Sequence, residues 1–368
     1  MSNTEVNDST APVLVEPLAV HQIDANALAA WLSKFIPDAA NGLTVQQFQG
    51  GMSNPTYFLS TADGTRYVLR KKPPGKLLPK AHAVDREHRV MQALEKTPVP
   101  VPHMVAYCDD PAVIGAEFFV MTYIDGRIIP AATMGAVPFE QRRALSFSLV
   151  DTLAALHNVD WQNVGLADYG RPAGYLARQV ARWAGQYEQS KPALPADFDY
   201  SDMDWLRDWL STQADQVADE SAIVHGDFRL GNTIVHPSEP KVIAVLDWEL
   251  STIGHPLADM AYLCLHYHIS SAIPGENENP NNLDLTDLGL PSEAEMLERY
   301  CQQTNRAGVP EWPIFLAFAC FRLAAIVQGV AARAAMGNVS SASADPEKDG
   351  ARARRIAEVG ATIARQFT

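Results

Sequence analysis

The sequence feature that most constrains the fold is a change of secondary-structure pattern near Gly126. Before this residue, short apolar runs are separated by turn residues, a pattern typical of strands. Beyond it, apolar residues recur at helical spacing over long segments. The predicted strands are Val45–Gly51, Thr56–Ser60, Arg66–Arg70 and Glu117–Tyr123, and the predicted helices are Asn26–Phe35, Ala83–Leu94, Gln141–His157, Gly174–Glu188 and Trp205–Val217. The chain is therefore predicted to be α+β, with a flexible tail at 1–26, a small β-rich N-lobe at 27–124 and a larger helical C-lobe at 125–368.

Size and charge narrow the classes of function. A chain of 368 residues that is 47% hydrophobic can bury a large core, which excludes a single small module and global disorder. The net charge of −14 argues against nucleic acid and anionic membranes as partners. The first ten residues lack the features of a signal peptide, so a cytoplasmic location is expected. The apolar segment 314–336 is interrupted by Arg322, Gln328 and Arg333, which predicts a buried core helix. The oligomeric state is not indicated.

The segment from Ile223 to Glu249 is the most informative part of the sequence. Two β-prone runs, Thr233–His236 and Lys241–Leu246, flank a turn at 237–240 that contains two prolines, which predicts an antiparallel hairpin. The midpoint between Asn232 and Asp247 falls inside that turn. The side chains of these two residues are therefore expected beside one another at the open end of the hairpin.

The residue types at this open end suit phosphoryl transfer. Asn232 and Asp247 offer the hard oxygen ligands that Mg²⁺ accepts when substrate phosphates also hold the metal. Asp227 lies on the loop that leads into the hairpin and could accept the proton of an attacking hydroxyl. A metal clamp and a positioned base are the protein parts that this reaction requires.

The same residues resemble a known family. His225-x-Asp227, an Asn five residues after the Asp, and Asp247 after a short hairpin resemble the catalytic core of the aminoglycoside phosphotransferase and choline kinase group, within the protein-kinase-like fold. The resemblance implies a two-lobed kinase-like fold with an active site between the lobes and a catalytic loop within 223–249. It also implies that Asp227 is the catalytic base, that Asn232 and Asp247 hold Mg²⁺, and that His225 supports the loop. ATP and Mg²⁺ are the implied cofactors.

Further positions match the family less closely. Arg70 stands where most kinases have a phosphate-contacting Lys, and Glu87 on the next helix could pair with it or be an exposed charge. Asp259 resembles a family aspartate that braces the catalytic loop, and His157 is expected to be a helix-end histidine without a catalytic role. The remaining nucleotide-site candidates are Gly51, Ser53 and Asn54 in the phosphate-covering loop, which could also be a plain turn, and Met121 and Tyr123 at the adenine hinge. Arg229 is a second catalytic candidate beside Asp227, because it occupies the place of a phosphate-facing Lys in protein kinases, although it could also face solvent.

Two longer segments point to one branch of the family. RYVLRKKPPGKLLPKAHAVDREHRVM and LDWELSTIGHPLADMAY are most similar to the kinase-like domain that precedes some long acyl-CoA dehydrogenases. The resemblance implies an ATP-dependent phosphotransferase acting on the hydroxyl of a small molecule, which could be a hydroxyacyl-CoA. The alternatives are a catalytically silent nucleotide-binding partner of an acyl-CoA dehydrogenase, and an aminoglycoside-type antibiotic phosphotransferase. Because the sequence ends at Thr368 without a flavin-binding segment, dehydrogenase activity is not expected.

A basic segment bears on the choice of acceptor. Five of the eleven residues from 70 to 80 are basic, namely Arg70, Lys71, Lys72, Lys76 and Lys80. The segment could be a solvated loop. It could also be an anion site for nucleotide phosphates or for a second phosphorylated group such as that of coenzyme A. Aminoglycosides are polycations and would prefer an acidic cleft.

Overall fold

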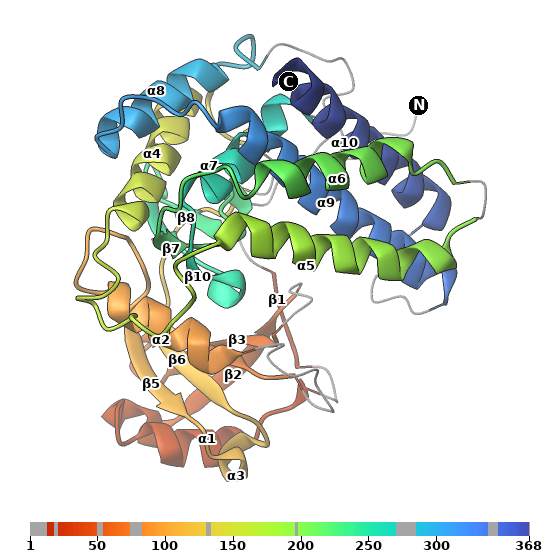
Figure 1. Cartoon of the computed structure of the whole chain (residues 1–368). Coiled ribbons are helices and arrows are strands. Elements are labelled where there is room, and N and C mark those ends of the chain that lie inside the picture. The colour runs from red at the N-terminus through yellow and green to blue at the C-terminus, as the bar shows by residue number, and fades with distance from the viewer. Residues whose placement is uncertain are drawn as a thin grey trace, which may run out of the picture. The chain divides into compact units, whose positions relative to one another are not determined.

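The chain forms two compact units. A computed structural model describes residues 13–17, 21–49, 54–73, 83–129, 134–195, 198–269, 285–337 and 345–367. One unit comprises Met1–Ile129 and Gly231–Ser251, and the other comprises Pro130–Leu230 and Thr252–Thr368. The protein-kinase-like α+β fold predicted from the sequence is confirmed, with a sheet in the N-terminal unit and mainly helices in the C-terminal unit (Figure 1).

The N-terminal unit is built around an antiparallel sheet. Among the described residues its strand order is β1-β2-β3-β4-β6-β5. The strands are β1 (Leu14–Val15), β2 (Leu43–Phe48), β3 (Thr56–Thr61), β4 (Arg66–Lys71), β5 (Met104–Cys108) and β6 (Phe118–Thr122). The predicted hairpin of β3 and β4 is confirmed. It turns at Gly64, whose φ of +85° lies in the left-handed region that glycine adopts at little cost.

The helices of this unit are amphipathic or short. They are α1 (Ala25–Leu32), α2 (Val84–Leu94) and α3 (Pro111–Ile114). The Asp24 carboxylate caps α1 by accepting hydrogen bonds from the N–H groups of Asn26 and Ala27. Leu28 and Leu32 of α1 belong to the same buried apolar cluster as Tyr57 and Leu59 of β3. Burial of this one face of the sheet stabilises the unit.

The predicted domain boundaries differ from the observed units in two places. Within the predicted tail of 1–26, β1 pairs with β2, and α1 begins at Ala25. Residues 231–251, predicted within the C-lobe, group with the N-terminal unit because backbone hydrogen bonds tie them to it. Val235 exchanges hydrogen bonds with Arg127, and the Val245 N–H donates to Pro100. The predicted boundary at residue 124 stays a prediction.

The C-terminal unit is mainly helical. Its strands β7 (Ala222–Val224) and β10 (Thr252–Gly254) pair antiparallel. Its helices are α4 (Phe139–His157), α5 (Tyr175–Ser190), α6 (Ser201–Gln213), α7 (Leu257–Cys264), α8 (Glu293–Gln303), α9 (Trp312–Ala335) and α10 (Pro346–Phe367). Each helix predicted in this region is present, with ends shifted by a few residues.

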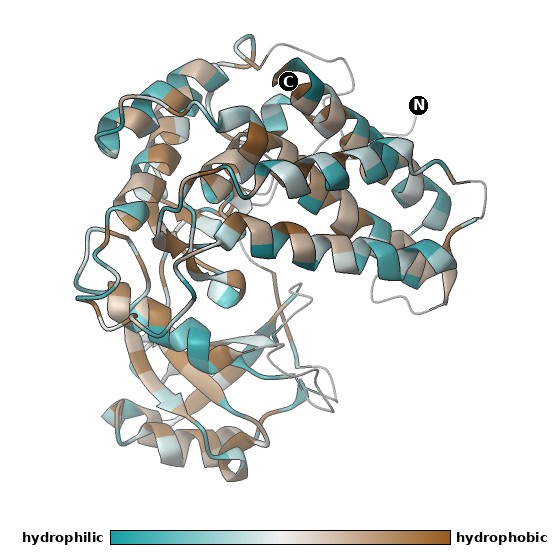
Figure 2. Cartoon of the chain, viewed as in Figure 1, coloured by the Kyte–Doolittle hydropathy of each residue, from teal (hydrophilic) through white to brown (hydrophobic). Residues whose placement is uncertain are grey.

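The apolar helix α9 forms the centre of this unit. It is long and apolar enough to cross a membrane, but 83% of its most apolar 18-residue window is buried inside the structure. Figure 2 shows α9 as largely hydrophobic, whereas α5 and α6 alternate hydrophobic with hydrophilic residues. Gly360 of α10 approaches α9 so closely that an added Cβ would lie 2.7 Å from Cβ of Cys320. The predicted buried core helix is confirmed.

Candidate active site

A buried carboxylate holds the loop that carries the predicted base. Asp259 of α7 is 1% exposed, and its two oxygens accept the N–H groups of His225 at 2.6 Å and Gly226 at 2.8 Å. Gly226 has a φ of +86°, a left-handed conformation that a side chain would strain. The bracing position predicted for Asp259 is therefore present in the structure.

Asp227 follows this held segment and has polar neighbours within the same unit. Its N–H donates to Nδ1 of His225 at 3.2 Å, which agrees with the predicted support of the loop by His225. Nε of Arg229 lies 3.6 Å from Oδ2 of Asp227. Burial raises the pKa of the Tyr262 phenol, on α7, and the charge of Asp227 raises it further. Arg229 therefore lies beside the predicted base, with its side chain 35% exposed, and its catalytic role stays a prediction.

Two further residues support this loop and were not assigned to it from the sequence. Arg322 of α9 is 8% exposed and donates to the carbonyl oxygen of Gly226. His157, at the end of α4, places Nε2 3.5 Å from Oδ2 of Asp259 and Nδ1 2.8 Å from the hydroxyl of Tyr300. The position of His157 at a helix end was predicted, whereas its contact with Asp259 was not. The sequence signal that could have found Arg322 is a charged residue within an apolar helix.

A second group of candidate residues, in the N-terminal unit, is organised by one guanidinium. Nη1 of Arg70 lies 3.0 Å from Oε1 of Glu87, and Nη2 donates to Oδ1 of Asp247 at 2.7 Å. Oε2 of Glu249 lies 3.9 Å from the same Nη2. The predicted Arg70–Glu87 pair is present, and Glu87 is 1% exposed, so it is not an exposed helix charge. Sequence reasoning gave Glu249 no role.

The charges of this group do not cancel. One guanidinium faces three carboxylates, which leaves a net charge of −2 when all four groups are ionised. Burial raises the pKa of Glu87 to about 7, and the attraction of Arg70 offsets part of this effect. The excess negative charge favours binding of a cation.

Asn232 and Asp247 lie near each other as predicted, but their register is shifted by one residue. In the hairpin of β8 (Thr233–Val235) and β9 (Val242–Val245), Thr233 pairs with Val245, and the Leu246 N–H donates to the Asn232 carbonyl oxygen at 2.8 Å. Asn232 therefore lies opposite Leu246, one residue before Asp247. Asp247 comes next, with a left-handed φ of +65°.

These two residues fit a magnesium ion in their chemistry. The Asp247 side chain is 35% exposed, and Asn232 offers an amide oxygen. Among the described residues no group of three or more His, Cys, Asp or Glu could hold a metal. Mg²⁺ is commonly bound through one or two protein oxygens, with phosphates and water completing the octahedron, so a set of two ligands is sufficient.

The remaining predicted nucleotide residues are only partly described. Met121 lies buried on β6, opposite Val68 of β4. Tyr123 follows β6, and its ring packs against Phe58 at a centroid distance of 5.4 Å. Asn54 is 2% exposed, whereas Gly51 and Ser53 lie outside the described residues. Contact of these residues with a nucleotide stays a prediction.

The described part of the basic segment is not a free cationic surface. Lys71 is 5% exposed, its Nζ lies 5.6 Å from the ring centroid of Tyr57, and burial lowers its pKa. Lys72 forms an ion pair with Glu117. Lys76 and Lys80 lie outside the described residues. The interpretation of 70–80 as one solvated or anion-binding face therefore fails for Lys71 and Lys72.

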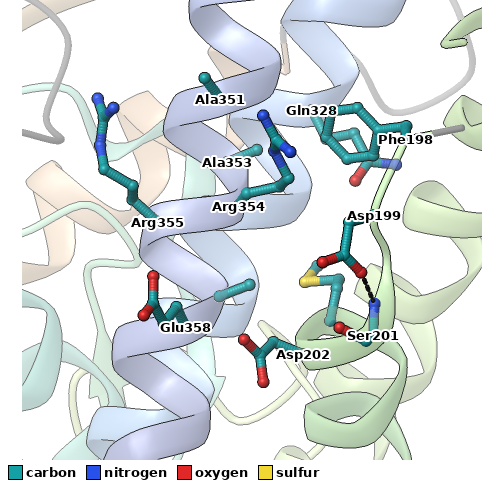
Figure 3. Close-up of a pocket in the computed structure, with 12 residues that line it drawn as sticks. Phe198, Asp199, Ser201, Asp202, Gln328, Ala351, Ala353, Arg354, Arg355 and Glu358 are labelled. Carbon is teal, nitrogen blue, oxygen red and sulfur yellow. Dashed lines mark hydrogen bonds between the residues drawn. The ribbon is translucent and has the colours of Figure 1, made fainter.

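Two cavities in the C-terminal unit differ in whether predicted site residues line them. One of about 400 Å³ lies between the start of α6, α9 and α10, and its walls include Phe198 and Arg354 but none of the predicted site residues (Figure 3). The other, of about 30 Å³, has room for about one water molecule, and Arg229 and Tyr262 are among its lining residues. Its other lining residues are Met134, Ser146, Leu149, Leu230, Leu263, His266, Leu290 and Met296.

Comparison with known proteins decides the family. The model of the phosphotransferase enzyme family matches residues 44–284, which include Asp227, Asn232 and Asp247. The chain belongs to the phosphotransferase enzyme family. A solved protein of Ralstonia eutropha JMP134 that carries a provisional aminoglycoside phosphotransferase name is 41% identical, with a TM-score of 0.81 over 94% of this chain and 99% of that one.

More distant and longer relatives complete the comparison. Aminoglycoside phosphotransferase APH(4)-Ia, solved with AMP-PNP and hygromycin B, is 14% identical with a TM-score of 0.59, covers 91% of this chain and 98% of its own, and shares the fold. "Acyl-CoA dehydrogenase family member 11" of Rattus norvegicus is 43% identical over 333 residues, which are 89% of this chain. This chain spans about two fifths of the length of that relative.

Proposed function

We propose that this family member transfers the γ-phosphoryl group of ATP, with Mg²⁺, to a hydroxyl of a small molecule. The observation that carries the proposal is the fixed base: Asp227 follows two backbone amides that a single buried carboxylate, Asp259, holds in place. A base held in this way can accept a proton without reorganising the loop. Membership of the phosphotransferase family supports the same reaction class.

The proposed reaction assigns a task to each group. The acceptor oxygen attacks the γ-phosphorus, a new O–P bond forms, and the bond from that phosphorus to the bridging oxygen of ADP breaks. Asp227 receives the proton of the acceptor hydroxyl. Asn232 and Asp247 would hold Mg²⁺, which would neutralise charge on the phosphates. Nη2 of Arg70, which donates to Asp247 in the structure, would donate to the phosphate oxygens instead.

The identity of the nucleotide is supported by the family fold. The APH(4)-Ia structure with the same fold contains AMP-PNP, an analogue of ATP. The group of Arg70, Glu87 and Asp247 matches the parts that a kinase needs for the phosphates of a nucleotide. We therefore propose ATP as the phosphoryl donor.

For the acceptor we propose a hydroxyacyl-CoA. Relatives with more than 40% identity carry acyl-CoA dehydrogenase names. The cavity beside Arg229 and Tyr262, of about 30 Å³, has room for about one water molecule and so does not bear on the choice of acceptor. The described part of the basic segment adds no support, because Lys71 and Lys72 are already engaged.

A screen of acceptors tests this proposal. The purified chain is incubated with Mg·ATP and, separately, 3-hydroxyacyl-CoAs of several lengths, amino alcohols, sugars and aminoglycosides, and the phosphorylated product is identified by mass spectrometry. We expect phosphorylated hydroxyacyl-CoA, with kcat reduced roughly 10²–10⁴-fold by Asp227→Asn at nearly unchanged ATP affinity. ATP binding without turnover on any acceptor would favour a silent nucleotide-binding protein. Turnover that is restricted to aminoglycosides would refute the choice of acceptor.

A further inference from the structure

The peptide group between Gly226 and Asp227 is held at both of its polar atoms. Its carbonyl oxygen, which belongs to Gly226, accepts a hydrogen bond from Nη2 of Arg322. Its N–H, which belongs to Asp227, donates to Nδ1 of His225 at 3.2 Å. Because a peptide group is planar, hydrogen bonds at two opposite edges fix its rotation. This plane leads directly into the Cα atom of Asp227, so its orientation helps to set the direction of the carboxylate.

Arg322 reaches the loop from α9, which packs against both α5 and α7. Its guanidinium carbon lies 5.1 Å from the centroid of the Tyr262 ring on α7 and 5.5 Å from the centroid of the Trp183 ring on α5. The residue is buried, so its contacts are shielded from water. A guanidinium held against two rings has little freedom to move, and it therefore presents Nη2 to the loop in one orientation.

The positive charge of Arg322 is not balanced by a carboxylate at close range. Among the described residues its guanidinium forms no ion pair, and its hydrogen bond goes to the neutral carbonyl oxygen of Gly226. Burial of a charge without an opposite charge costs free energy, whereas most other buried residues of α9 are apolar. Helix packing alone would therefore favour an apolar residue here. The hydrogen bond to the loop gives the arginine a role that an apolar residue could not fill.

We propose that Arg322 is a positioning residue for phosphoryl transfer: by holding the carbonyl oxygen of Gly226, it fixes the peptide plane that aims the Asp227 carboxylate at the acceptor hydroxyl. The inference rests on the proposed function, because it assumes that Asp227 is the base. Arg322 complements Asp259, which accepts the N–H of Gly226 at 2.8 Å. Gly226 is thus held at its N–H by a buried carboxylate and at its carbonyl oxygen by a buried guanidinium.

The matched variants are Arg322→Met and Arg142→Met. Arg142, on α4, is a part-buried arginine that donates to the carbonyl oxygens of Val137 and Leu288, each at 2.9 Å. Its guanidinium carbon also lies 5.8 Å from the centroid of the Phe139 ring. Arg142 therefore makes the same kinds of contact as Arg322 but does not bind the loop.

Turnover of these variants is measured with Mg·ATP and 3-hydroxybutyryl-CoA and, in parallel, with water as the acceptor. We expect Arg322→Met to lower kcat about tenfold or more, as the loss of one hydrogen bond from a charged group implies, with the KM of ATP within about twofold. Arg142→Met should change neither constant beyond about twofold. Normal kcat in Arg322→Met would overturn the inference.

A conservative variant separates positioning from packing. Arg322→Lys keeps a positive charge and a donor for the carbonyl oxygen of Gly226, whereas methionine fills similar space without a donor. We therefore expect kcat of Arg322→Lys to lie between those of the unchanged chain and Arg322→Met. If Arg322 only fills space between the helices, methionine should be the better replacement, so a higher kcat in Arg322→Met than in Arg322→Lys would contradict the inference.

A second background tests whether Arg322 acts through the base. In Asp227→Asn the base is absent, so adding Arg322→Met should change the residual rate less than about twofold. A further tenfold loss in that background would show that Arg322 acts by another route and would overturn the inference. Near-normal turnover of Asp227→Asn alone would instead refute the proposed function, which keeps the two failures distinguishable.

A measurement without substrate covers the case in which no acceptor is turned over. Backbone hydrogen exchange is followed by mass spectrometry in peptides that cover residues 224–229 of the unchanged chain, Arg322→Met and Arg142→Met. Loss of the bond to Gly226 should let the peptide group rotate and expose the N–H of Asp227, so we expect exchange about tenfold faster or more in Arg322→Met alone. Unchanged exchange would overturn the inference. Faster exchange in a chain that turns over no acceptor would support the hold on the loop and count against the proposed function alone.

Discussion

The two groups of candidate residues are held by different kinds of interaction. In the C-terminal unit, the loop of Asp227 is fixed by backbone hydrogen bonds to Asp259 and Arg322. In the N-terminal unit, Asp247 is held by an ion pair with Arg70, which also pairs with Glu87. Backbone hydrogen bonds fix one geometry, whereas an ion pair can exchange one partner for another. The proposed base is therefore held rigidly, whereas the proposed metal ligand can change partners.

This difference has a chemical reason. A base must accept a proton at one defined position, so mobility lowers the rate. Asp247, the proposed metal ligand, is a carboxylate whose negative charge Arg70 offsets. When Mg²⁺ and phosphates bind, the carboxylate and the guanidinium would each gain a new partner. The net charge of the group makes this exchange favourable.

The largest effect is expected from Asp247→Ala. The change removes a principal ligand of the proposed metal, so we expect Mg²⁺-dependent nucleotide affinity to fall by about 100-fold or more in calorimetry. Asp125→Ala is the control, because Asp125 pairs with Arg66 at an exposed site of the same unit. Unchanged Mg·ATP affinity in Asp247→Ala would show that the negatively charged group around Arg70 is not the metal site.

The next largest effect is expected from replacing Asp259, whose carboxylate holds the backbone just before Asp227. In Asp259→Asn, the amide group can accept only one of the two N–H groups of His225 and Gly226, and its NH₂ faces the other. An unsatisfied buried donor costs about 1–3 kcal/mol in the free energy of unfolding. We also expect kcat to fall about tenfold with little change in the KM of ATP. Asp151→Asn, which breaks a half-exposed pair with Arg299, should cost less than about 1 kcal/mol.

A smaller effect is expected from Arg70→Lys. The guanidinium contacts Glu87 through Nη1 and Asp247 through Nη2, and a single ammonium cannot reproduce this fork. We expect the KM of ATP to rise roughly fivefold to tenfold, with a smaller change in kcat. An equal fall in kcat and in kcat/KM at constant KM would place the role of Arg70 in the transition state and contradict the proposed exchange of partners.

Local patterns in the sequence predicted much of the fold. The β3–β4 hairpin, α2, α4 and α9 follow from turn residues and apolar periodicity, and the hairpin of β8 and β9 brings Asn232 and Asp247 together. The exact register could not be foreseen: even counting from the Val235–Val242 pair would place Asn232 opposite Val245, and an irregularity between Ile234 and Val235 moves it opposite Leu246. Equal counting from the turn assumes a ladder without a bulge.

Contacts between distant segments were not predictable from local patterns. Arg322 reaches Gly226 across 96 positions of sequence, and His157 reaches Asp259 across about a hundred. Neither residue stands in a motif with fixed spacing to the loop. Lys71 looked like part of a basic surface, but the alternation of side chains along β4 turns it to a buried side. The family resemblance supplied the role of Asp259, which spacing alone does not give.

The smallest expected effect concerns the pH dependence of stability in the N-terminal unit. Burial raises the pKa of Glu87 from 4.5 to about 7, so between these values the folded chain binds more protons at this site than the unfolded chain. The free energy of unfolding that Glu87 contributes is therefore fully present below about pH 4.5 and is lost as the pH rises through 7. His255 and His266, whose pKa values desolvation lowers to about 4, change stability in the opposite direction between pH 4 and 6.5. Glu87→Gln keeps both histidines and removes the carboxyl. We therefore expect the denaturant midpoint of unfolding of this variant, minus that of the unchanged chain, to increase as the pH is raised from 4.5 to 8. A difference that is constant over this range would mean that Arg70 keeps Glu87 ionised throughout, and that the group around Arg70 is set by its ion pairs alone.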